Sequence, residues 1–156
     1  MFRLAFRMTG NQLDAEDIVQ DTFLKAWKQI ARFDGRAGFG TWLHRICTNC
    51  SLDHIRARKR VQDRDSGDEF LAQAPAATPS PERLAQSTQI TALLGAALDE
   101  LSGMERSAFV LRHYEGLSIE DISAALGVQP GAAKHSVFRA VQKLRRALEP
   151  AMAVRK

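Results

Sequence analysis

The sequence predicts an all-α protein, with two small helical domains joined by a flexible linker and a helix-turn-helix as the C-terminal domain. Three observations support this prediction. Apolar side chains recur at helical spacing in several segments, and no segment shows the alternation of a half-buried strand. An acidic, proline-containing stretch separates two groups of such segments. Near the C-terminus, a short segment ending in a glycine precedes a long basic one.

The N-terminal domain is predicted to span residues 1–60, with a helix from about Asp14 to Ile30. Asp14 is the expected N-cap, because its carboxylate can accept hydrogen bonds from the free amides of the first turn. Helical spacing places one apolar stripe toward the core, made of Ile18, Val19, Phe23, Ala26, Trp27 and Ile30. Three glycines then interrupt the pattern within residues 33–40.

A longer, basic helix is predicted from Thr41 to about Arg60. Helical spacing places along one side Arg45, Asn49, Leu52, Arg56 and Arg60. Another side holds Leu43, Ile46, Cys47 and Cys50. One side of this helix can therefore meet a polyanion such as DNA while the other side packs.

Residues 61–89 are predicted to form the flexible linker. Their first part is acidic, and three prolines between residues 74 and 81 do not allow a continuous helix or a central strand. The C-terminal domain is predicted to span residues 90–150, with helices at Ile90–Leu101, Met104–Tyr114, Ile119–Leu126 and Pro130–Leu148. Ser102 and Glu105 have the spacing of a capping box for the second of these helices.

The last two predicted helices have the boundary signals of a helix-turn-helix. Ser118 can cap the first through the amide of Asp121, and Gly127 can take the left-handed conformation at its end. Pro130 can open the second helix, where a missing amide costs nothing. We therefore expect residues 118–148 to form two helices joined by a tight turn.

The second helix of this pair has an apolar stripe and a polar face opposite to it. The stripe is expected to be buried and comprises Ala133, Val137, Ala140, Val141, Leu144 and Leu148. The opposite face comprises His135, Arg139, Gln142, Lys143 and Arg146. Residues 130–156 hold seven Lys or Arg and one Glu, whereas residues 90–129 hold two basic and six acidic residues. This asymmetry favours binding to nucleic-acid phosphates, and a solvated face on an ordinary core helix is the alternative.

Composition excludes several classes of protein. No run of about 18 apolar residues occurs and no secretory signal precedes the first helix, so a cytoplasmic protein without membrane insertion is expected. Two cysteines are too few for a disulfide framework. No Ser-His-Asp arrangement, phosphate-binding glycine loop or pair of catalytic carboxylates stands out, so we expect a non-enzyme without cofactor or metal ion.

Two blocks of the sequence resemble bacterial sigma factors. Asp14–Trp27, Phe33, Thr41–Asn49 and Asp53–Arg56 resemble region 2 of these proteins, and Leu98–Leu148 resembles region 4. With the blocks in this order and only a short linker between them, the chain resembles the extracytoplasmic-function (ECF) group of the sigma-70 family. This resemblance implies a protein that binds core RNA polymerase, directs it to promoter DNA and assists strand opening. It also implies an anti-sigma factor as a partner.

The resemblance implies two binding surfaces in region 2. Family members dock this first helix on the polymerase clamp, which implies the core-binding residues Asp17, Gln20, Asp21 and Leu24; a plain solvated helix face is the alternative. The following loop and helix recognise the minus-ten element and capture an extruded base. The candidates are Phe33, Arg36 and Phe39 in the loop, and Arg45, Asn49, Asp53, Arg56 and Arg60 along the helix. Trp42 is expected in the core, and Asp53 can instead pair with a neighbouring arginine.

In region 4, the resemblance implies that the recognition helix enters the major groove of the minus-thirty-five element. The candidates are Lys134, His135, Phe138, Arg139 and Lys143. Arg139 can form two hydrogen bonds with guanine, and Lys134 can bind a phosphate. Residues 135 and 136 depart from the Ser-Arg pair that is commoner in the family, so the base preference of the family does not transfer.

Two other functions remain open from the sequence. A stand-alone helix-turn-helix regulator would use the C-terminal domain, but this leaves Asp14–Trp27 and the basic Arg45–Arg60 helix unexplained. A thiol or metal sensor could use Cys47, Cys50 and His54, which lie at positions i, i+3 and i+7, although no fourth ligand is evident.

Overall fold

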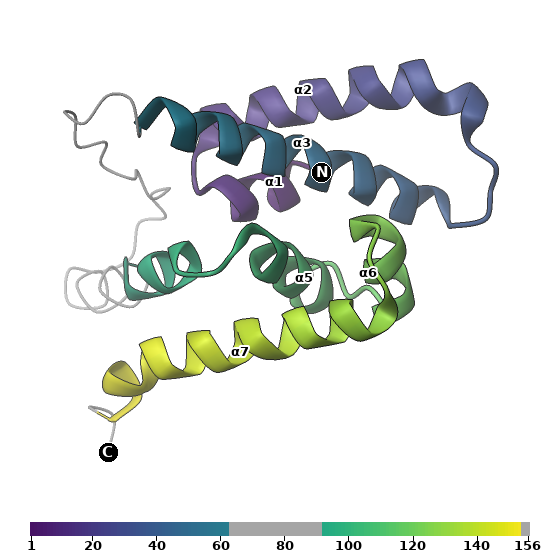
Figure 1. Cartoon of the computed structure of the whole chain (residues 1–156). Helices are drawn as coiled ribbons and strands as arrows, with labels where there is room; N and C mark the ends of the chain where they lie inside the picture. The colour runs from purple at the N-terminus through teal and green to yellow at the C-terminus, as the bar shows by residue number, and fades with distance from the viewer. Residues whose placement is uncertain (63–91, 154–156) are drawn as a thin grey trace, which may run out of the picture.

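A computed structural model describes residues 1–62 and 92–153 of the chain (Figure 1). Within these ranges every regular element is a helix, which confirms the all-α prediction for the described residues. Figure 1 shows an N-terminal half (residues 1–62) lying against a C-terminal half (residues 92–153). From residue 63 onward, the linker predicted at 61–89 lies outside the described residues. None of the described helices combines the length and the apolar character needed to cross a membrane.

The N-terminal half contains α1 (Phe2–Thr9), α2 (Gln12–Gln29), the short 3-10 helix η1 (Ile30–Arg32) and α3 (Phe39–Gln62). Gly10 ends α1 in the left-handed conformation, with φ of 70°, which lets the chain turn sharply into α2. The three main helices pack on one another in every pairing. Their shared core includes Leu4, Met8, Ile18 and Cys47.

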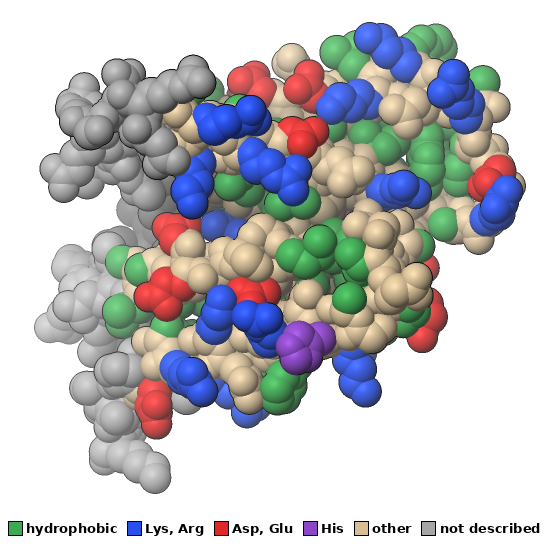
Figure 2. Space-filling view, viewed as in Figure 1, with side chains coloured by type: hydrophobic (Ala, Val, Ile, Leu, Met, Phe, Trp, Pro, Cys, Tyr) green, Lys and Arg blue, Asp and Glu red, His purple; other side chains and the backbone are tan. Residues whose placement is uncertain are grey.

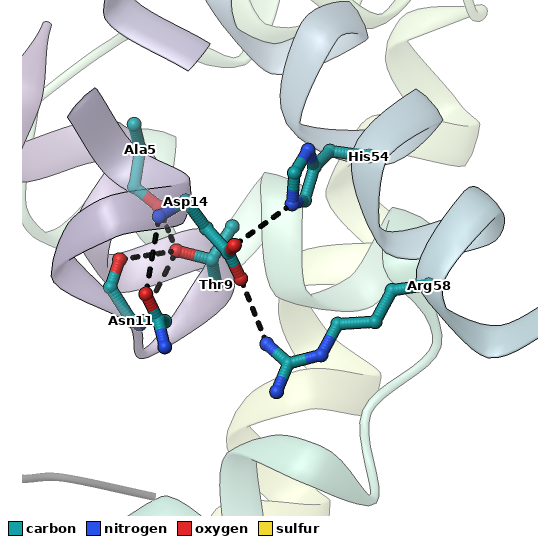
Figure 3. Close-up of polar contacts among 6 residues, drawn as sticks. All are labelled: Ala5, Thr9, Asn11, Asp14, His54 and Arg58. Atoms are coloured by element: carbon teal, nitrogen blue, oxygen red, sulfur yellow. Dashed lines mark hydrogen bonds and ion pairs between the residues drawn. The ribbon is translucent and has the colours of Figure 1, made fainter. Parts of the chain in front are cut away.

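The prediction that Asp14 is the N-cap of α2 is wrong. Asn11 is the cap: its backbone is extended, and its side-chain Oδ1 accepts a hydrogen bond from the Asp14 amide at 3.1 Å. The Asp14 carboxylate points instead to α3, where His54 Nε2 lies 3.1 Å from one oxygen and Arg58 Nη1 lies 2.7 Å from the other (Figure 3). The helix therefore begins two residues earlier than predicted, and Asp14 ties α2 to α3.

The predicted apolar stripe of α2 is wrong in part. The residues that α2 buries are Ala15, Ile18, Thr22 and Ala26. Val19 is half-buried, but Phe23, Trp27 and Ile30 are exposed, Trp27 to 80%. Helices α1 and α3 both pack on α2, and the buried residues of α2 form only one narrow line along it. The larger apolar residues lie beyond the edge of that contact.

The C-terminal half begins, within the described residues, with a helix at 92–99. It continues through α5 (Gly103–His113), α6 (Ile119–Leu126) and α7 (Pro130–Ala153). Both hydrogen bonds of the predicted capping box between Ser102 and Glu105 are present. Ser118 caps α6, and Gly127 ends it with φ of 65°. The predicted bounds of α6 and the predicted start of α7 are therefore confirmed, but α7 ends at Ala153 and not at Leu148.

The predicted stripe of α7 is confirmed. Its buried members are Ala133, Ala140 and Leu144, and its half-buried members are Val137, Val141 and Leu148. These side chains pack α7 along α5 and α6 (Figure 1). On the opposite side, the predicted residues are exposed except Lys143, which is half-buried.

The two halves share one continuous set of buried side chains. Helix α6 packs on α3, and α5 packs on α1. The buried cluster runs from Leu4 and Cys47 in the N-terminal half to Ile122 in the C-terminal half. Gly103 permits a close approach, since a Cβ at this position would lie 2.8 Å from Cδ2 of Leu52. Leu52, which helical spacing had placed on the basic side of its helix, is therefore buried.

Polar contacts also join the halves. Thr41 Oγ1 donates a hydrogen bond to Asp121 Oδ1 at 3.3 Å. Arg106 Nε donates to the backbone carbonyl of Arg7 at 3.1 Å, and the Arg7 guanidinium lies 4.0 Å from the centre of the Tyr114 ring. The Arg7 contact with an aromatic face is a cation–π interaction. The halves are thus joined by directional contacts as well as by apolar burial.

Candidate nucleic-acid and protein interfaces

The exposed side of α7 carries the predicted recognition residues. Lys134, His135, Phe138 and Arg139 are all exposed, and Lys143 is half-buried. Phe138 is 57% exposed, so its ring is accessible beside the cations of this face. Figure 2 shows Lys and Arg side chains over α7 with carboxylates beside them. This side of α7 thus offers cations, an imidazole and an aromatic ring to a ligand.

One carboxylate beside α7 is buried. The side chain of Glu105, in the first turn of α5, is only 5% exposed. Its Oε1 lies 3.2 Å from Arg139 Nε, and its Oε2 lies 2.7 Å from Lys143 Nζ. From the sequence, Glu105 was predicted only as part of a capping box. No local pattern connects it to residues that follow 34 and 38 positions later in the chain.

The pKa of Glu105 depends on two opposing effects. Burial alone would raise the pKa of this carboxyl, because it disfavours the charged form. The hydrogen bonds from Lys143 and from the Ser102 amide, with the charges of Lys143 and Arg139, outweigh burial and lower the pKa below its usual value. Glu105 is therefore an anion at neutral pH.

A second basic surface lies on α3 and the end of α2. The predicted residues Arg45, Asn49, Asp53, Arg56 and Arg60 are all exposed on α3. Asp53 accepts a hydrogen bond from Arg56 at 3.4 Å, which was the alternative considered for this aspartate. Two of the residues, Arg45 and Asn49, line a pocket of about 460 Å³.

The pocket is basic and has an aromatic side. Its lining residues are Lys25, Gln29, Arg32, Trp42, Arg45, Ile46 and Asn49. Three of these residues, from α2 and η1, were not predicted from the sequence, namely Lys25, Gln29 and Arg32. Their spacing of i, i+4 and i+7 places them on one helix face. A helical wheel of residues 25–32 would therefore have shown that they lie together. Cations around an aromatic ring suit a nucleotide, whose base stacks and whose phosphate is anionic.

Phe33, at the end of η1, forms an aromatic cluster with two residues of α3, and one of these, Trp42, lines the pocket. Phe39, which was predicted in the loop, is the first residue of α3. The ring of Phe33 lies 5.7 Å from that of Phe39 and 5.2 Å from that of Trp42, measured between centroids. Trp42 is half-buried, so the expectation that it belongs to the core holds only in part. The third loop candidate, Arg36, is exposed and its Nε lies 2.8 Å from Asp34 Oδ2.

The predicted polymerase-binding residues share the outer face of α2. Asp17, Gln20, Asp21 and Leu24 are all exposed. Apolar side chains that are also exposed adjoin them, among them Leu13, Phe23 and Trp27. An apolar surface with carboxylates within it has the character of a protein interface. The aromatic members were missed because the sequence analysis assigned them to the core.

The cysteines lie in the core. Cys47 is fully buried and Cys50 nearly so. Burial raises the pKa of the Cys47 thiol, although a hydrogen bond with Thr22 opposes the shift. His54 does not join the thiols, since its Nε2 contacts Asp14. Among the described residues, no three His, Cys, Asp or Glu side chains are grouped to hold a metal ion.

Comparisons with known proteins match both halves. The family model for sigma-70 region 2 matches residues 1–61, and that for sigma-70 region 4 matches residues 91–144. The ECF RNA polymerase sigma factor SigE of Mycolicibacterium smegmatis is 41% identical over 93% of this chain, and the chain covers 56% of that protein. The chain thus spans just over half the length of SigE.

Two shorter relatives are covered more fully. The RNA polymerase sigma-H factor of Pseudomonas aeruginosa is 32% identical, with 94% of this chain and 79% of the relative aligned. The ECF sigma factor SigW of Bacillus subtilis is 32% identical, with 95% of this chain and 82% of the relative aligned.

Solved structures show the same arrangement of helices. The sigma factor RpoE of Bartonella quintana, in complex with the anti-sigma factor NepR, aligns with a TM-score of 0.73 at 31% identity and covers 95% of this chain and 89% of its own. CnrH, in complex with the cytosolic domain of CnrY, aligns with a TM-score of 0.64 at 27% identity, over 96% of this chain and 80% of its own.

Proposed function

The chain belongs to the ECF group of the sigma-70 family, and we propose from this premise that it acts as an alternative sigma factor. In this role it binds core RNA polymerase in the cytoplasm, selects promoters and assists strand opening, while the polymerase performs the chemistry. The observation that carries the proposal is the pair of exposed basic surfaces, one on α7 and one on α3 with its pocket. A stand-alone regulator would need only the first.

The α7 surface reads the upstream promoter element in this proposal. Lys134, His135, Phe138 and Arg139 are available to a major groove because nothing in the described chain covers them. Arg139 contacts a base edge, and Lys134 neutralises a phosphate. A bidentate contact between arginine and guanine contributes about 1–3 kcal/mol of discrimination.

The α3 surface binds the downstream element during strand opening. Flipping a base out of the duplex costs a few kcal/mol, and stacking on an aromatic ring returns about 1–3 kcal/mol per base. The pocket beside Trp42 supplies such a ring together with the cations Lys25, Arg32 and Arg45. Exposed arginines along α3, such as Arg56 and Arg60, extend the positive surface along the strand.

Binding of both elements requires the halves to separate. A compact chain of 156 residues is roughly 40 Å across. Elements about 25 base pairs apart, as their names indicate, lie about 85 Å apart at about 3.4 Å per base pair. The packed arrangement of Figure 1 is therefore a state that does not hold both elements at once.

Regulation by an anti-sigma factor follows from the same premise. RpoE of Bartonella quintana, whose fold this chain shares, was solved with the anti-sigma factor NepR. We assign an anti-sigma partner to this chain as well, since a protein that holds the halves together keeps them from engaging promoter DNA.

Run-off transcription with purified core polymerase and a genomic promoter library tests the proposal. Wild-type protein is compared with an Asp17→Ala, Asp21→Ala double variant and with Arg139→Ala. Glu100→Ala and Arg145→Ala serve as matched controls, because each removes an exposed charge of the same sign away from the proposed contacts. Transcripts that require the protein, weaken in the first two variants and persist in the controls support the proposal. Duplex binding without polymerase association or transcription would favour the stand-alone regulator.

A further inference from the structure

The buried carboxylate of Glu105 is held by the backbone at the start of its own helix. The backbone amide of Ser102 donates a hydrogen bond to Oε2 at 3.0 Å. The Ser102 hydroxyl accepts a hydrogen bond from the Glu105 amide at 3.2 Å. Because the capping box fixes the residue at both its backbone and its side chain, the carboxylate has a defined position at the start of α5.

The same carboxylate restrains two side chains of the recognition helix. Oε1 meets Arg139 Nε at 3.2 Å, and Oε2 meets Lys143 Nζ at 2.7 Å. One anion then lies between two cations, so the cluster keeps a net positive charge toward a DNA phosphate backbone. Lys143 is only half-buried, but its ammonium group is occupied by Glu105.

The contact engages one edge of the Arg139 guanidinium. Glu105 Oε1 forms an ion pair at Nε, and the Arg139 side chain remains 56% exposed. The two terminal nitrogens of a guanidinium can bind a base edge when the paired carboxylate lies at Nε. A free arginine loses rotamer freedom when it binds, whereas a restrained one has lost part of that freedom already.

We propose that Glu105 is a positioning residue for promoter recognition, which orients Arg139 so that its terminal nitrogens meet one base pair of the upstream element. This inference rests on the proposed function of α7. It assigns Glu105 to the selection of a base, beyond its role as a helix cap. It also assigns Lys143 to holding Glu105 rather than to contacting DNA directly.

The test separates positioning from capping. Glu105→Gln keeps the size of the side chain and the capping box, because glutamine also serves at this position, but it removes the anion. Ser102→Ala is the matched control, since it weakens the cap and leaves Glu105 facing Arg139. Each variant is assayed as full chain with core polymerase on a promoter library randomised at the upstream element, alone and combined with Arg139→Ala.

If Glu105 positions Arg139, preference at one base pair falls about 2- to 10-fold in Glu105→Gln, which corresponds to the cost of ordering one side chain. In Glu105→Gln the preference at the other base pairs stays unchanged. In Ser102→Ala the preference at every base pair stays unchanged. In a protein that already carries Arg139→Ala, the Glu105 substitution has no further effect on that preference, because Glu105 acts only through Arg139.

Two results would overturn the inference. One is an unchanged base preference in Glu105→Gln while the variant remains folded by circular dichroism. The other is a uniform loss of transcription across all sequences that Ser102→Ala reproduces, which makes Glu105 a cap alone. If the wild-type protein itself gives no promoter-specific transcription, the proposed function and this inference are both overturned. Failure of the inference alone is seen only in the variants, while the wild-type protein still transcribes.

Discussion

His44 of α3 lies with its Nε2 3.3 Å from Oε2 of Glu115, in the turn that follows α5. The other oxygen of this carboxylate, Oε1, lies 3.8 Å from Nη1 of Arg7 in α1. One residue of the C-terminal half thus contacts two helices of the N-terminal half. The proposed function requires the halves to separate, and Glu115 belongs to the contact that such an opening would break.

Removing the Glu115 carboxylate is expected to favour separation of the halves. In Glu115→Ala, both contacts are lost; a partly exposed ion pair of this kind is worth about 1 kcal/mol, which raises the ratio of open to packed protein about fivefold. Small-angle X-ray scattering of the full chain should show a larger radius of gyration. Glu120→Ala, an exposed acid on α6, is the control and should scatter as wild type. An unchanged radius in Glu115→Ala would show that apolar packing alone sets the arrangement.

The cap of α2 gives a pair of substitutions with opposite outcomes. Asn11→Ala removes the oxygen that accepts the Asp14 amide and should lower the free energy of unfolding by about 1 kcal/mol. Asn11→Asp keeps an acceptor and should be nearly neutral. Chemical denaturation followed by circular dichroism measures both.

Asp14→Asn provides the complementary test. Asparagine caps as well as aspartate does, so this change would be harmless if Asp14 were the cap. In the structure it weakens the contacts with His54 and Arg58, and we expect a loss of up to about 1 kcal/mol. A stable Asp14→Asn variant together with a stable Asn11→Ala variant would contradict the geometry of Figure 3.

Acid should weaken the contact between α5 and α7. The pKa of Glu105 is lower in the folded chain than the ordinary glutamate value of about 4.5. The stabilisation from its charge is therefore complete above pH 4.5 and disappears as the pH falls through the lower folded pKa. The difference in melting temperature between wild type and Glu105→Gln should be constant near neutrality and shrink below pH 4.5. A difference that does not change with pH would mean that Glu105 is not paired as an anion.

The thiols should be unreactive in the folded protein. Cys47 and Cys50 are buried, and burial raises the pKa of Cys47, so little thiolate is accessible to an alkylating reagent. We expect labelling by iodoacetamide at pH 8 to follow the rate of unfolding, with full labelling in denaturant. Rapid labelling of the native chain, or protection by added zinc, would revive the thiol or metal sensor hypothesis.

Features that depend on neighbouring residues were predictable from the sequence. The capping box of Ser102 and Glu105, the cap at Ser118 and the turn at Gly127 each involve groups within a few residues of one another, and all are present. The division of α7 into a buried stripe and an exposed face followed in the same way from helical spacing. The sequence by itself therefore determined the helix-turn-helix and the side of α7 that is free to bind.

Features that depend on which surfaces meet were decided only by the tertiary structure. Asn11 and Asp14 are both good caps by residue type, but the Asp14 carboxylate contacts His54 and Arg58 of α3 instead of capping α2. Trp27 is a large apolar residue of the kind that is usually buried, yet it lies beyond the face of α2 that is enclosed. Spacing along one helix reports which residues share a face, but not which face a distant helix covers.

The pairing of Glu105 with Arg139 and Lys143 illustrates the same limit at the candidate site. Each residue type was visible in the sequence, and the two cations were correctly placed on one side of α7. Their anion comes from another helix, and its position follows from the packing of α5 on α7. Charges separated by more than 30 residues have no periodic relationship, so only folding brings them within hydrogen-bonding distance. The sequence thus determined the helices and their chemistry, and the packing of those helices decided which side chains are paired and which remain free for a ligand.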